Sequence, residues 1–463
     1  MLAPPEVAVP PQQDQVFAHV TVLNPGERPL HDYTVEVKGG NITGLRPSIE
    51  ADPVGECTGC WVMPGLIDAH VHFPPAVLRG NQEIFALLYL AHGVTTIRDV
   101  GQADGSVVDL AEKLNGGTLA GPRMYRCGPV LEGDPPAWPT ARVLHTAAEA
   151  TQAVDELAAG GVDCLKLYNE IGPKVYEAIA VAAKRHELPL IGHVPHKVGL
   201  RNVRYFEAQH MTGLPYVTRP RPPVGDDVAF VDVLAMDGAE INGALAVAKR
   251  NNVSFTPTLA NFKLRLSASD PTRFPPPTAL ATLPAFWQQG FRLVAGFPKT
   301  ETGIAQQQAM YPALVAQVRQ AREMNIPILA GTDTLMPYVI PGDALHRELA
   351  ALQEPLGSAE AALTAATLVN GRAIDDGNIG RIAVGARADL LLLSADPRDD
   401  LSVLKAWRTV IVDGRVYDPA FIASTLSTYQ TYFDGWLYRA LTSALVGLLA
   451  SSYQSAEAAK SDN

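Results

Sequence analysis

Between about residues 61 and 380, short apolar segments alternate with longer stretches of helical periodicity. Eight of these segments are predicted to be strands: 61–67, 94–98, 123–127, 163–168, 188–192, 205–209, 253–257 and 326–330. Strands separated by helices form parallel sheets, and eight such units are typical of the (β/α)8 or TIM barrel of the α/β class. A doubly wound open sheet is the alternative, but no glycine-rich dinucleotide fingerprint follows any of the strands.

The two ends of the chain have a different pattern from the middle. Residues from about 15 to 60 alternate like short strands joined by Asn-Pro-Gly and Gly-Gly turns, and strand patterns return at 388–393 and 409–417. We therefore expect residues 1–62 and 381–424 to form one small β-sandwich domain built from both chain ends.

The remaining residues divide into a long central domain and a tail. Residues 63–380 are expected to form the barrel, with an insertion at 263–305 that carries aromatic residues and a run of three prolines. Residues 425–463 contain leucines at helical spacing. They are expected to form a C-terminal helical tail that packs on the barrel or on a neighbouring subunit.

The composition limits the kinds of binding partner and the cellular location that we expect for this protein. The net charge of −11 argues against a nucleic acid or an anionic membrane as partner. Four cysteines are too few for a disulfide scaffold, and the Cys57–Cys60 pair has no second pair to complete a zinc site. The first residues lack the basic start and apolar core of a signal peptide. We expect a cytoplasmic homo-oligomer that acts on a small molecule, binds no nucleic acid and has no stable membrane insertion.

Two of the predicted strands carry residues that suit a metal site. His70 and His72 lie two residues apart in the first strand, so both imidazoles face the same way and can share one ion. Lys166 lies within an apolar strand, where a charged amine is costly. It either pairs with a buried carboxylate or has a depressed pKa and reacts with carbon dioxide. The resulting carbamate would bridge two cations.

Polar residues also follow three later strands. His193 and His210 come at the ends of the fifth and sixth strands, and Asp333 follows the eighth. The carboxyl ends of barrel strands meet at one face, which is where barrel enzymes place their active sites. Asp333 could cap a turn, or it could bind metal and accept a proton from water. Arg98 and Asp99 are expected to form an internal ion pair near the same face.

At these positions the sequence resembles the amidohydrolase superfamily. The similar motifs are PGLIDAHVH at 64–72, the lysine of the fourth strand, one histidine after each of the next two strands, and Gly-Thr-Asp at 331–333. The segments around Lys166, His193 and His210 are similar to the imidazolonepropionase-like group, which includes Xaa-Pro dipeptidases and ochratoxin-hydrolysing amidases. Gln209 departs from this pattern, because a glutamate commonly precedes the histidine there.

The resemblance implies a binuclear centre of two divalent metal ions. One ion would be held by His70, His72 and Asp333, the other by His193 and His210, with carboxylated Lys166 as the bridging ligand. Zinc suits imidazole and carboxylate ligands best, although cobalt, manganese or iron could substitute. A metal-bridging hydroxide would attack a carbonyl. Asp333 would be the catalytic residue that takes the proton of the water and passes it to the leaving nitrogen.

Three further side chains, Tyr168, His196 and Tyr338, are candidates for substrate binding. The expected reaction is hydrolysis of an amide, carbamate or urea-type C–N bond in a small molecule or an N-acyl amino acid. Cleavage of Xaa-Pro dipeptides is an alternative within this class. The same centre could instead act as an esterase, lactonase or phosphotriesterase. A non-catalytic scaffold is the least favoured alternative, because all six ligand positions are filled.

Overall fold

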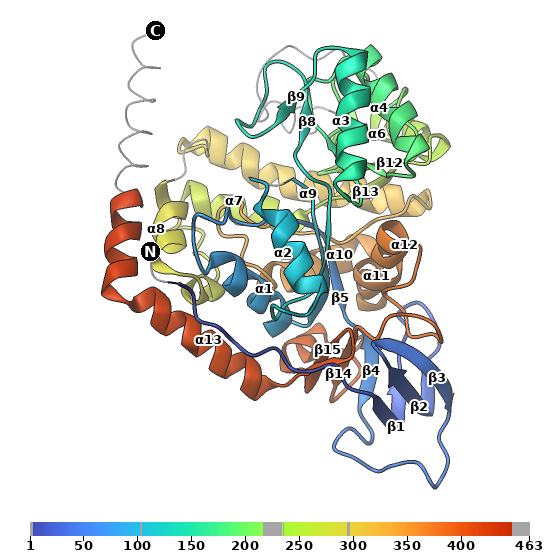
Figure 1. Ribbon diagram of the computed structural model, residues 1–463. Helices are drawn as coiled ribbons and strands as arrows, with labels where there is room; N and C mark the ends of the chain where they lie inside the picture. Colours follow the sequence, from blue (N-terminus) through green and yellow to red (C-terminus); the bar gives the residue numbers. More distant parts are fainter. Residues whose placement is uncertain (1–2, 102–103, 216–233, 235, 294–296, 447–463) are drawn as a thin grey trace.

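Strands from both ends of the chain form one seven-stranded sheet in the computed structural model, which describes residues 3–101, 104–215, 234, 236–293 and 297–446. The strands are β1 (Gln15–Val22), β2 (Leu30–Lys38), β3 (Asn41–Pro47), β4 (Trp61–Pro64), β14 (Leu390–Leu393), β15 (Thr409–Val412) and β16 (Arg415–Tyr417). Their order is β16-β15-β14-β4-β1-β2-β3, in which β4 is antiparallel to β14 and parallel to β1. Figure 1 shows β1 to β4, from the start of the chain, beside β14 and β15 at the lower end of the molecule.

This sheet confirms part of the sequence prediction. Both chain ends contribute strands to one hydrogen-bonded sheet, as expected, while its folding into a sandwich stays a prediction. One face is covered because alternate side chains of β1 and β2, such as Val20, Val22 and Val35, pack into an apolar cluster. The domain limits at 1–62 and 381–424 stay predictions.

The middle of the chain forms two parallel sheets. Their strands are β5 (Leu66–Val71), β6 (Val94–Asp99), β7 (Arg123–Arg126), β8 (Leu131–Glu132), β9 (Arg142–Val143), β10 (Leu165–Leu167), β11 (Leu190–Gly192), β12 (Phe206–Gln209) and β13 (Ser254–Thr256). The order is β5-β6-β7 in one sheet and β13-β12-β11-β10-β8-β9 in the other. Every neighbouring pair is parallel. This is the parallel α/β arrangement that the alternation of strands and helices predicts.

Both edge strands of the three-stranded sheet, β5 and β7, make contacts that lead to the six-stranded sheet. The eighth predicted segment, 326–330, is bridged to β13 by Phe255 and Ile328, and the Ala69 N–H of β5 donates to the Ala330 carbonyl at 3.0 Å. At the other edge, the Asp163 N–H donates to the Arg126 carbonyl at 2.7 Å. The structure is therefore TIM-barrel-like, while closure into a regular eight-stranded barrel stays a prediction.

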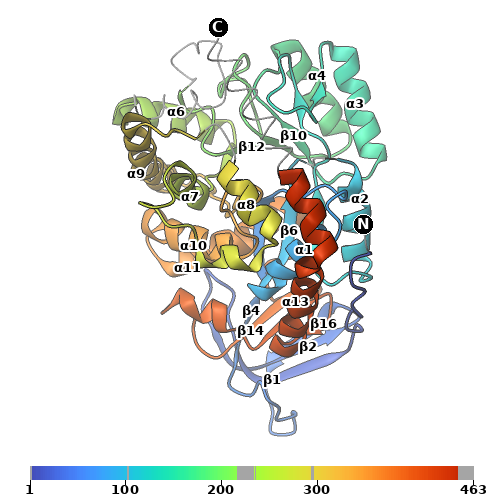
Figure 2. The same ribbon diagram turned by 90° about the vertical axis from the view of Figure 1, so that its left-hand side faces the viewer.

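Helices surround these strands on the outside (Figure 2). They are α1 (Asn81–Ala91), α2 (Ser106–Asn115), α3 (Ala147–Ala159), α4 (Pro173–Arg185), α6 (Gly238–Arg250), α7 (Leu259–Ser269), η2 (Thr278–Thr282), α8 (Ala285–Leu293), α9 (Glu301–Glu323), α10 (Asp343–Leu356), α11 (Ala359–Thr364), η3 (Ala365–Val369), α12 (Asn370–Asp375), η4 (Leu401–Ala406) and α13 (Pro419–Asp434). Within the described part of the chain, none of them has the length and apolar character needed to cross a membrane.

The insertion and the tail both pack on α1. In the insertion, Trp287 of α8 donates its indole N–H to Asn81 Oδ1 at 2.7 Å. In the tail, α13 contacts α1, residues 436–446 continue as helix, and Asn81 Nδ2 donates to the Tyr438 hydroxyl at 2.8 Å. Asn81, buried at the start of α1, therefore holds both segments. Residues 294–296 of the predicted insertion and 447–463 of the predicted tail lie outside the described residues.

One disulfide lies beside the parallel strands. Cys127, after β7, is bonded to Cys164, before β10, whereas Cys57 and Cys60 are free. Burial raises the pKa of Cys57 to about 12, the opposite of what a reactive thiol requires. Disulfides are rare in cytosolic proteins, so the cytoplasmic location stays a prediction.

Removing this disulfide tests its contribution to stability. Replacing both Cys127 and Cys164 by alanine should lower the free energy of unfolding by about 3 kcal/mol, because cross-linked residues restrict the unfolded chain. Urea denaturation measures the difference, and reduction of the wild type should cause a similar loss. The pair Cys57→Ala/Cys60→Ala closes no loop and is the matched control. An equal loss in both pairs would show that side-chain packing, and not the cross-link, causes the effect.

Glu348 of α10 caps the first turn of α7. Its two carboxyl oxygens accept the backbone N–H groups of Leu259 and Ala260 at 3.0 and 2.6 Å, and its side chain is fully buried. The residue that precedes α7, Thr258, makes no side-chain cap of its own. The carboxyl group from α10 therefore satisfies backbone donors that would otherwise be buried without partners.

This cap should make stability depend on pH. Burial raises the pKa of Glu348 from 4.5 to about 8. The folded chain thus keeps a proton that the unfolded chain releases, so the stability contributed by this group is lost as pH rises through that window. The free energy of unfolding should fall by at most about 1.4 kcal/mol per pH unit for this one group. In denaturation experiments between about pH 5 and 8, Glu348→Gln should show a shallower decline than the wild type.

The control for this prediction is Glu354→Gln on the same helix. Glu354 is exposed and pairs only with Arg319 at 2.8 Å among the described residues. It should keep the pH dependence of the wild type. Identical pH profiles for Glu348→Gln and the wild type would contradict the assignment of the proton to Glu348.

Candidate metal centre

Asp333 is the point on which three histidines converge. Its Oδ1 lies 3.2 Å from His70 Nε2 and 3.3 Å from His72 Nε2, and its Oδ2 lies 3.9 Å from His210 Nε2. One ligand atom from each of His70, His210 and Asp333 lies within 4.8 Å of the others. The carboxyl ends of β5 and β12 and the segment after 326–330 thus meet at one place, as the sequence predicts.

His193 and Lys166 extend this group. The His193 ring, just after β11, lies 5.3 Å from the His210 ring between centroids. Lys166 lies in the middle of β10 and donates from Nζ to Gln209 Oε1. Its charge acts on His70 and His193, among others. The structure therefore places all six predicted ligand residues in one region, where five are buried and His72 is partly exposed, although their roles as ligands stay predictions.

The outer ring nitrogens of three histidines are held in a way that suits metal ligands. His72 Nδ1 lies 2.8 Å from the Gly101 carbonyl, His193 Nδ1 lies 3.0 Å from Asn169 Oδ1, and His210 Nδ1 lies 2.6 Å from Thr258 Oγ1. A carbonyl oxygen only accepts, so Nδ1 of His72 and of His193 carries a proton, and Nε2 is the ring atom of His72 that faces Asp333. Metal-ligating histidines are oriented by such contacts.

A different observation indicates that His70 also suits a metal ligand. It is fully buried, its Nδ1 has no partner among the described residues, and its Nε2 lies 3.2 Å from Asp333 Oδ1 without the geometry of a hydrogen bond. Buried polar atoms without partners are uncommon and call for an explanation. A cation bound at Nε2 would provide one, so the donor set fits a divalent metal ion.

Backbone strain is concentrated at the same place. His210, Thr258 and Asp333 have φ angles of 56°, 51° and 66°, which side-chain-bearing residues rarely adopt. Such conformations cost about 1–3 kcal/mol each and cluster at functional sites. Gly331 is required here because a Cβ atom would lie 2.7 Å from the Cβ of His70.

Burial shifts the pKa of most of the ligand groups, whereas the pKa of His72 is raised because its contact with Asp333 outweighs burial. Burial lowers the pKa of His70 and His193 well below the usual value, and that of His210 to about 3. It also lowers the pKa of Lys166 to about 7. Burial alone would raise the pKa of Asp333, but interactions with His70 and His210 outweigh it and lower that pKa well below normal. Neutral imidazoles beside a carboxylate are the forms that bind metal.

Asn261 is a residue of this site that the sequence analysis missed. It lies on α7 and donates from Nδ2 to Asp333 Oδ2 at 2.6 Å. Its side chain is fully buried, and its Oδ1 has no partner among the described residues. The only sequence signal is that Asn261 lies five residues after the end of β13, in the loop and helix that follow a strand.

The three predicted substrate residues lie in different surroundings. Tyr168 stacks on His193, with ring centroids 4.0 Å apart. His196 has Nδ1 3.2 Å from Glu170 Oε1. Tyr338 is buried, with its ring 5.7 Å from that of Phe291. Tyr168 is thus in contact with the ligand group, and the substrate roles of all three stay predictions.

The predicted ion pair between Arg98 and Asp99 is wrong. Arg98 instead binds Glu207 of β12 at 2.5 Å, while Asp99 accepts the backbone N–H groups of Phe73 and Gly101. Neighbouring residues of a strand point to opposite faces, so the two side chains diverge. Arg98 therefore spans the interior between β6 and β12.

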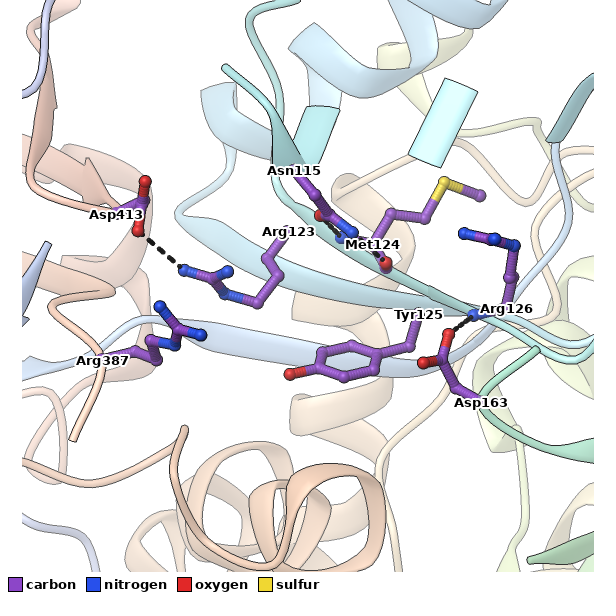
Figure 3. Close-up of a pocket in the computed structure, with 8 residues that line it drawn as sticks. All are labelled: Asn115, Arg123, Met124, Tyr125, Arg126, Asp163, Arg387 and Asp413. Carbon is purple, nitrogen blue, oxygen red and sulfur yellow. Dashed lines mark hydrogen bonds and ion pairs between the residues drawn. The ribbon is translucent and has the colours of Figure 1, made fainter. Parts of the chain in front are cut away.

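A separate cavity lies away from these residues. It has a volume of about 390 Å³ and is lined by Asn115, Arg123, Met124, Tyr125, Arg126, Asp163, Arg387 and Asp413 (Figure 3). Arg123 pairs with Asp389 at 3.0 Å and with Asp413 at 3.4 Å. None of the six predicted ligand residues lines this cavity. It is a different place from the candidate metal centre.

Comparison with known proteins agrees with the geometry. An uncharacterised protein of Mycobacterium tuberculosis (strain ATCC 25618 / H37Rv) is 26% identical over 424 residues, which are 88% of this chain and 98% of that protein. The bottromycin amidohydrolase structure matches with a TM-score of 0.69 and 24% identity over 91% of each chain. A candidate prolidase from Bifidobacterium longum matches with a TM-score of 0.64 and 27% identity, over 91% of this chain and 100% of that one.

The family assignment confirms the resemblance seen in the sequence. The chain matches the amidohydrolase family over residues 61–417, which include every predicted ligand residue. This protein therefore belongs to the amidohydrolase family, whose members include hydrolases of C–N bonds, and it is such a hydrolase.

Proposed function

We propose that the protein is a binuclear metal-dependent amidohydrolase. Its reaction is the hydrolysis of an amide, carbamate or urea-type C–N bond of a small molecule or an N-acyl amino acid. The observation that carries this proposal is the convergence of three imidazoles, those of His70 and His210 buried and that of His72 partly exposed, on Asp333 beside a buried lysine. The proposal also includes closure of the two parallel sheets into a (β/α)8 barrel.

The ligands divide into two sets. His70, His72 and Asp333 would hold one divalent ion, His193 and His210 would hold the other, and carboxylated Lys166 would bridge them. Zinc is the ion that these ligands suit best. When bound, the ions supply Lewis acidity, which lowers the pKa of water and polarises a carbonyl group.

Asp333 is the proposed acid and base. Its carboxylate is ionised at neutral pH, because its pKa lies well below the usual value, so it can take a proton from the attacking water. It then returns that proton to the leaving nitrogen. The hydrogen bond from Asn261 fixes Oδ2 and so holds the carboxylate in one orientation.

Lys166 fits the role of a carboxylated ligand. Its side chain is 2% exposed, and with a pKa of about 7 much of it is the neutral amine near neutral pH. Only the neutral amine has a lone pair that can react with carbon dioxide. We include Tyr168 in the proposal as a group that contacts substrate, because its ring is stacked on His193.

A Xaa-Pro dipeptidase is the second candidate. The observation that favours it is the likeness to the candidate prolidase, which spans 91% of this chain at 27% identity. Peptide and N-acyl bonds have the same carbonyl and leaving nitrogen, so the same residues would serve both reactions.

Metal loading and a substrate panel test the proposal. Chain reconstituted with zinc should bind two ions and hydrolyse at least one class among N-acyl amino acids, Xaa-Pro dipeptides, aryl carbamates and phenylureas. A chelator should abolish turnover. Lys166→Ala should lower turnover at least about a hundredfold, because mutation of residues that only support metal ligands already lowers activity 10–100-fold. Short carboxylic acids should restore part of it.

Lys174→Ala is the control for this experiment. Lys174 is exposed on α4, so its loss should change neither the metal content nor the turnover. Turnover that survives removal of the metal would refute the proposal. Metal content below one ion per chain in the loaded protein would refute the binuclear centre.

A further inference from the structure

The cavity of Figure 3 is lined by side chains from two different sheets. Arg123 and Arg126 are the first and last residues of β7 in the three-stranded sheet. Arg387 comes from the segment before β14, and Asp413 from the turn between β15 and β16, in the seven-stranded sheet. The volume of about 390 Å³ is at the lower end of the range for sites that bind small molecules. Because no predicted metal ligand lines this cavity, a ligand bound there would be additional to the substrate.

Arg123 is held in one orientation by two carboxylates. Its Nε donates to Asp389 Oδ2 at 3.0 Å, and its Nη2 donates to Asp389 Oδ1 and to Asp413 Oδ1, both at 3.4 Å. Among the described residues, its third nitrogen, Nη1, has no such partner. The guanidinium group presents its donors in a rigid planar fork, so two fixed nitrogens also fix the third. Arg123 therefore keeps one oriented donor for a ligand.

Arg387 points toward Arg123 from the other side of the cavity (Figure 3). These two residues are called the arginine pair below. The side chain of Arg387 is exposed, and within the described part of the chain its guanidinium makes no hydrogen bond or ion pair. Two guanidinium groups directed at one another repel, and an anion between them would turn this repulsion into attraction.

The carboxylates beside the arginine pair are already occupied by other partners. Asp413 accepts from Arg123 through Oδ1, and from Arg415 and Gln12 through Oδ2 at 2.9 and 3.2 Å. Asp389 accepts from Arg123 through both oxygens, and its Oδ1 also accepts the backbone N–H of Asp413 at 2.8 Å. Neither carboxylate is therefore available to neutralise the second guanidinium of the pair.

The other polar groups of the cavity lining do not provide an anion for the pair either. The Asn115 amide is bonded to the backbone of β7, and the Tyr125 hydroxyl donates to Asp375 at 2.8 Å. Asp163 accepts the backbone N–H of Arg126 at 2.8 Å, and Figure 3 shows both residues at the end away from the arginine pair. Arg126 Nε is buried and has no partner among the described residues. The unused hydrogen-bonding groups beside the pair are therefore donors on cations.

We propose that the arginine pair binds a phosphate group, either free or as part of a small phosphorylated molecule. A phosphate monoester has a charge of about −1.5 to −2 and three strong acceptor oxygens. It can therefore accept hydrogen bonds from two guanidinium groups on different sides, and its pairs with arginine are frequently bidentate. A carboxylate has one charge and two oxygens, so it suits the pair less well. The proposal goes beyond the proposed function and does not depend on it.

Binding of inorganic phosphate to the full-length, zinc-loaded chain tests this inference. Calorimetric titrations at constant ionic strength measure Kd for the wild type, Arg387→Gln and Arg387→Lys. Arg387→Gln should raise Kd about tenfold or more, because it removes charge-assisted hydrogen bonds. Arg387→Lys should give an intermediate value, because it keeps the charge and loses the planar fork. The side chain is exposed, so both variants should fold, which circular dichroism verifies.

Arg381→Gln is the matched control. Arg381 is exposed and precedes Arg387 by six residues, but it does not line the cavity. Its loss removes the same charge from the chain and should leave Kd unchanged. Phosphate that binds to zinc would bind equally in all of these variants, so only the component that changes with Arg387 belongs to the cavity.

Thermal denaturation provides a second readout. Phosphate at about ten times Kd should raise the ratio of folded to unfolded chain about elevenfold. The Tm should therefore rise in the wild type and in Arg381→Gln, but much less in Arg387→Gln at the same concentration.

The outcomes decide the proposal independently of the metal centre. A Kd that rises in Arg387→Gln and not in Arg381→Gln supports it. Equal values in the wild type and Arg387→Gln, or no phosphate binding in the wild type, would overturn it and leave the hydrolase intact. Acetate is the competing anion, and binding of acetate as tight as that of phosphate would overturn the choice of a phosphate group.

Discussion

The removal of ionisable groups from water at the ends of the parallel strands is the constraint on which this site depends. Asp333, His70 and His210 are all nearly or fully buried, so each must be neutral or must be neutralised by a neighbour. Burial lowers the pKa of both histidines and so favours their neutral forms, and the Nε2 atoms of both face the carboxylate of Asp333. Neutral imidazoles around one buried carboxylate leave its negative charge unbalanced. The group is therefore stable in the interior only if a metal cation, or protons on the imidazoles, balance that charge.

The strands determine where the six predicted ligand side chains lie, and neighbouring residues determine how the imidazole rings are oriented. Parallel strands place the six side chains at one end of the sheets, because their carboxyl ends coincide. The ring of each oriented histidine is then set by a neighbour, such as Gly101, Asn169 or Thr258. These neighbours are backbone carbonyls, amides and hydroxyls. They orient the imidazole rings without adding charge to a buried region, where each further charge would be costly.

Much of this arrangement could be predicted from the sequence, and the part that could not has a physical reason. The strand alternation and the pattern of His70, His72, His193 and His210 depend on local spacing, so they are visible in the chain itself. The pairing of Arg98 with Glu207 joins residues 109 positions apart, and the sequence suggested the adjacent Asp99 instead. The strand order of the composite sheet depends likewise on long-range pairing, because β14 binds β4 across more than three hundred residues.

Asn261 shows why such contacts escape prediction and why they matter. It is 72 residues from Asp333 in sequence, and Glu348, which caps the same helix, is 88 residues from Ala260. The chain runs from Asp333 into α10, whose Glu348 fixes the start of α7, and α7 then returns Asn261 to Asp333. The carboxylate of Asp333 is thus linked to α7 in two ways, directly through Asn261 and through α10 by way of Glu348. Because each contact needs the other two elements in place, the orientation of Asp333 is a property of the complete fold and of no single motif.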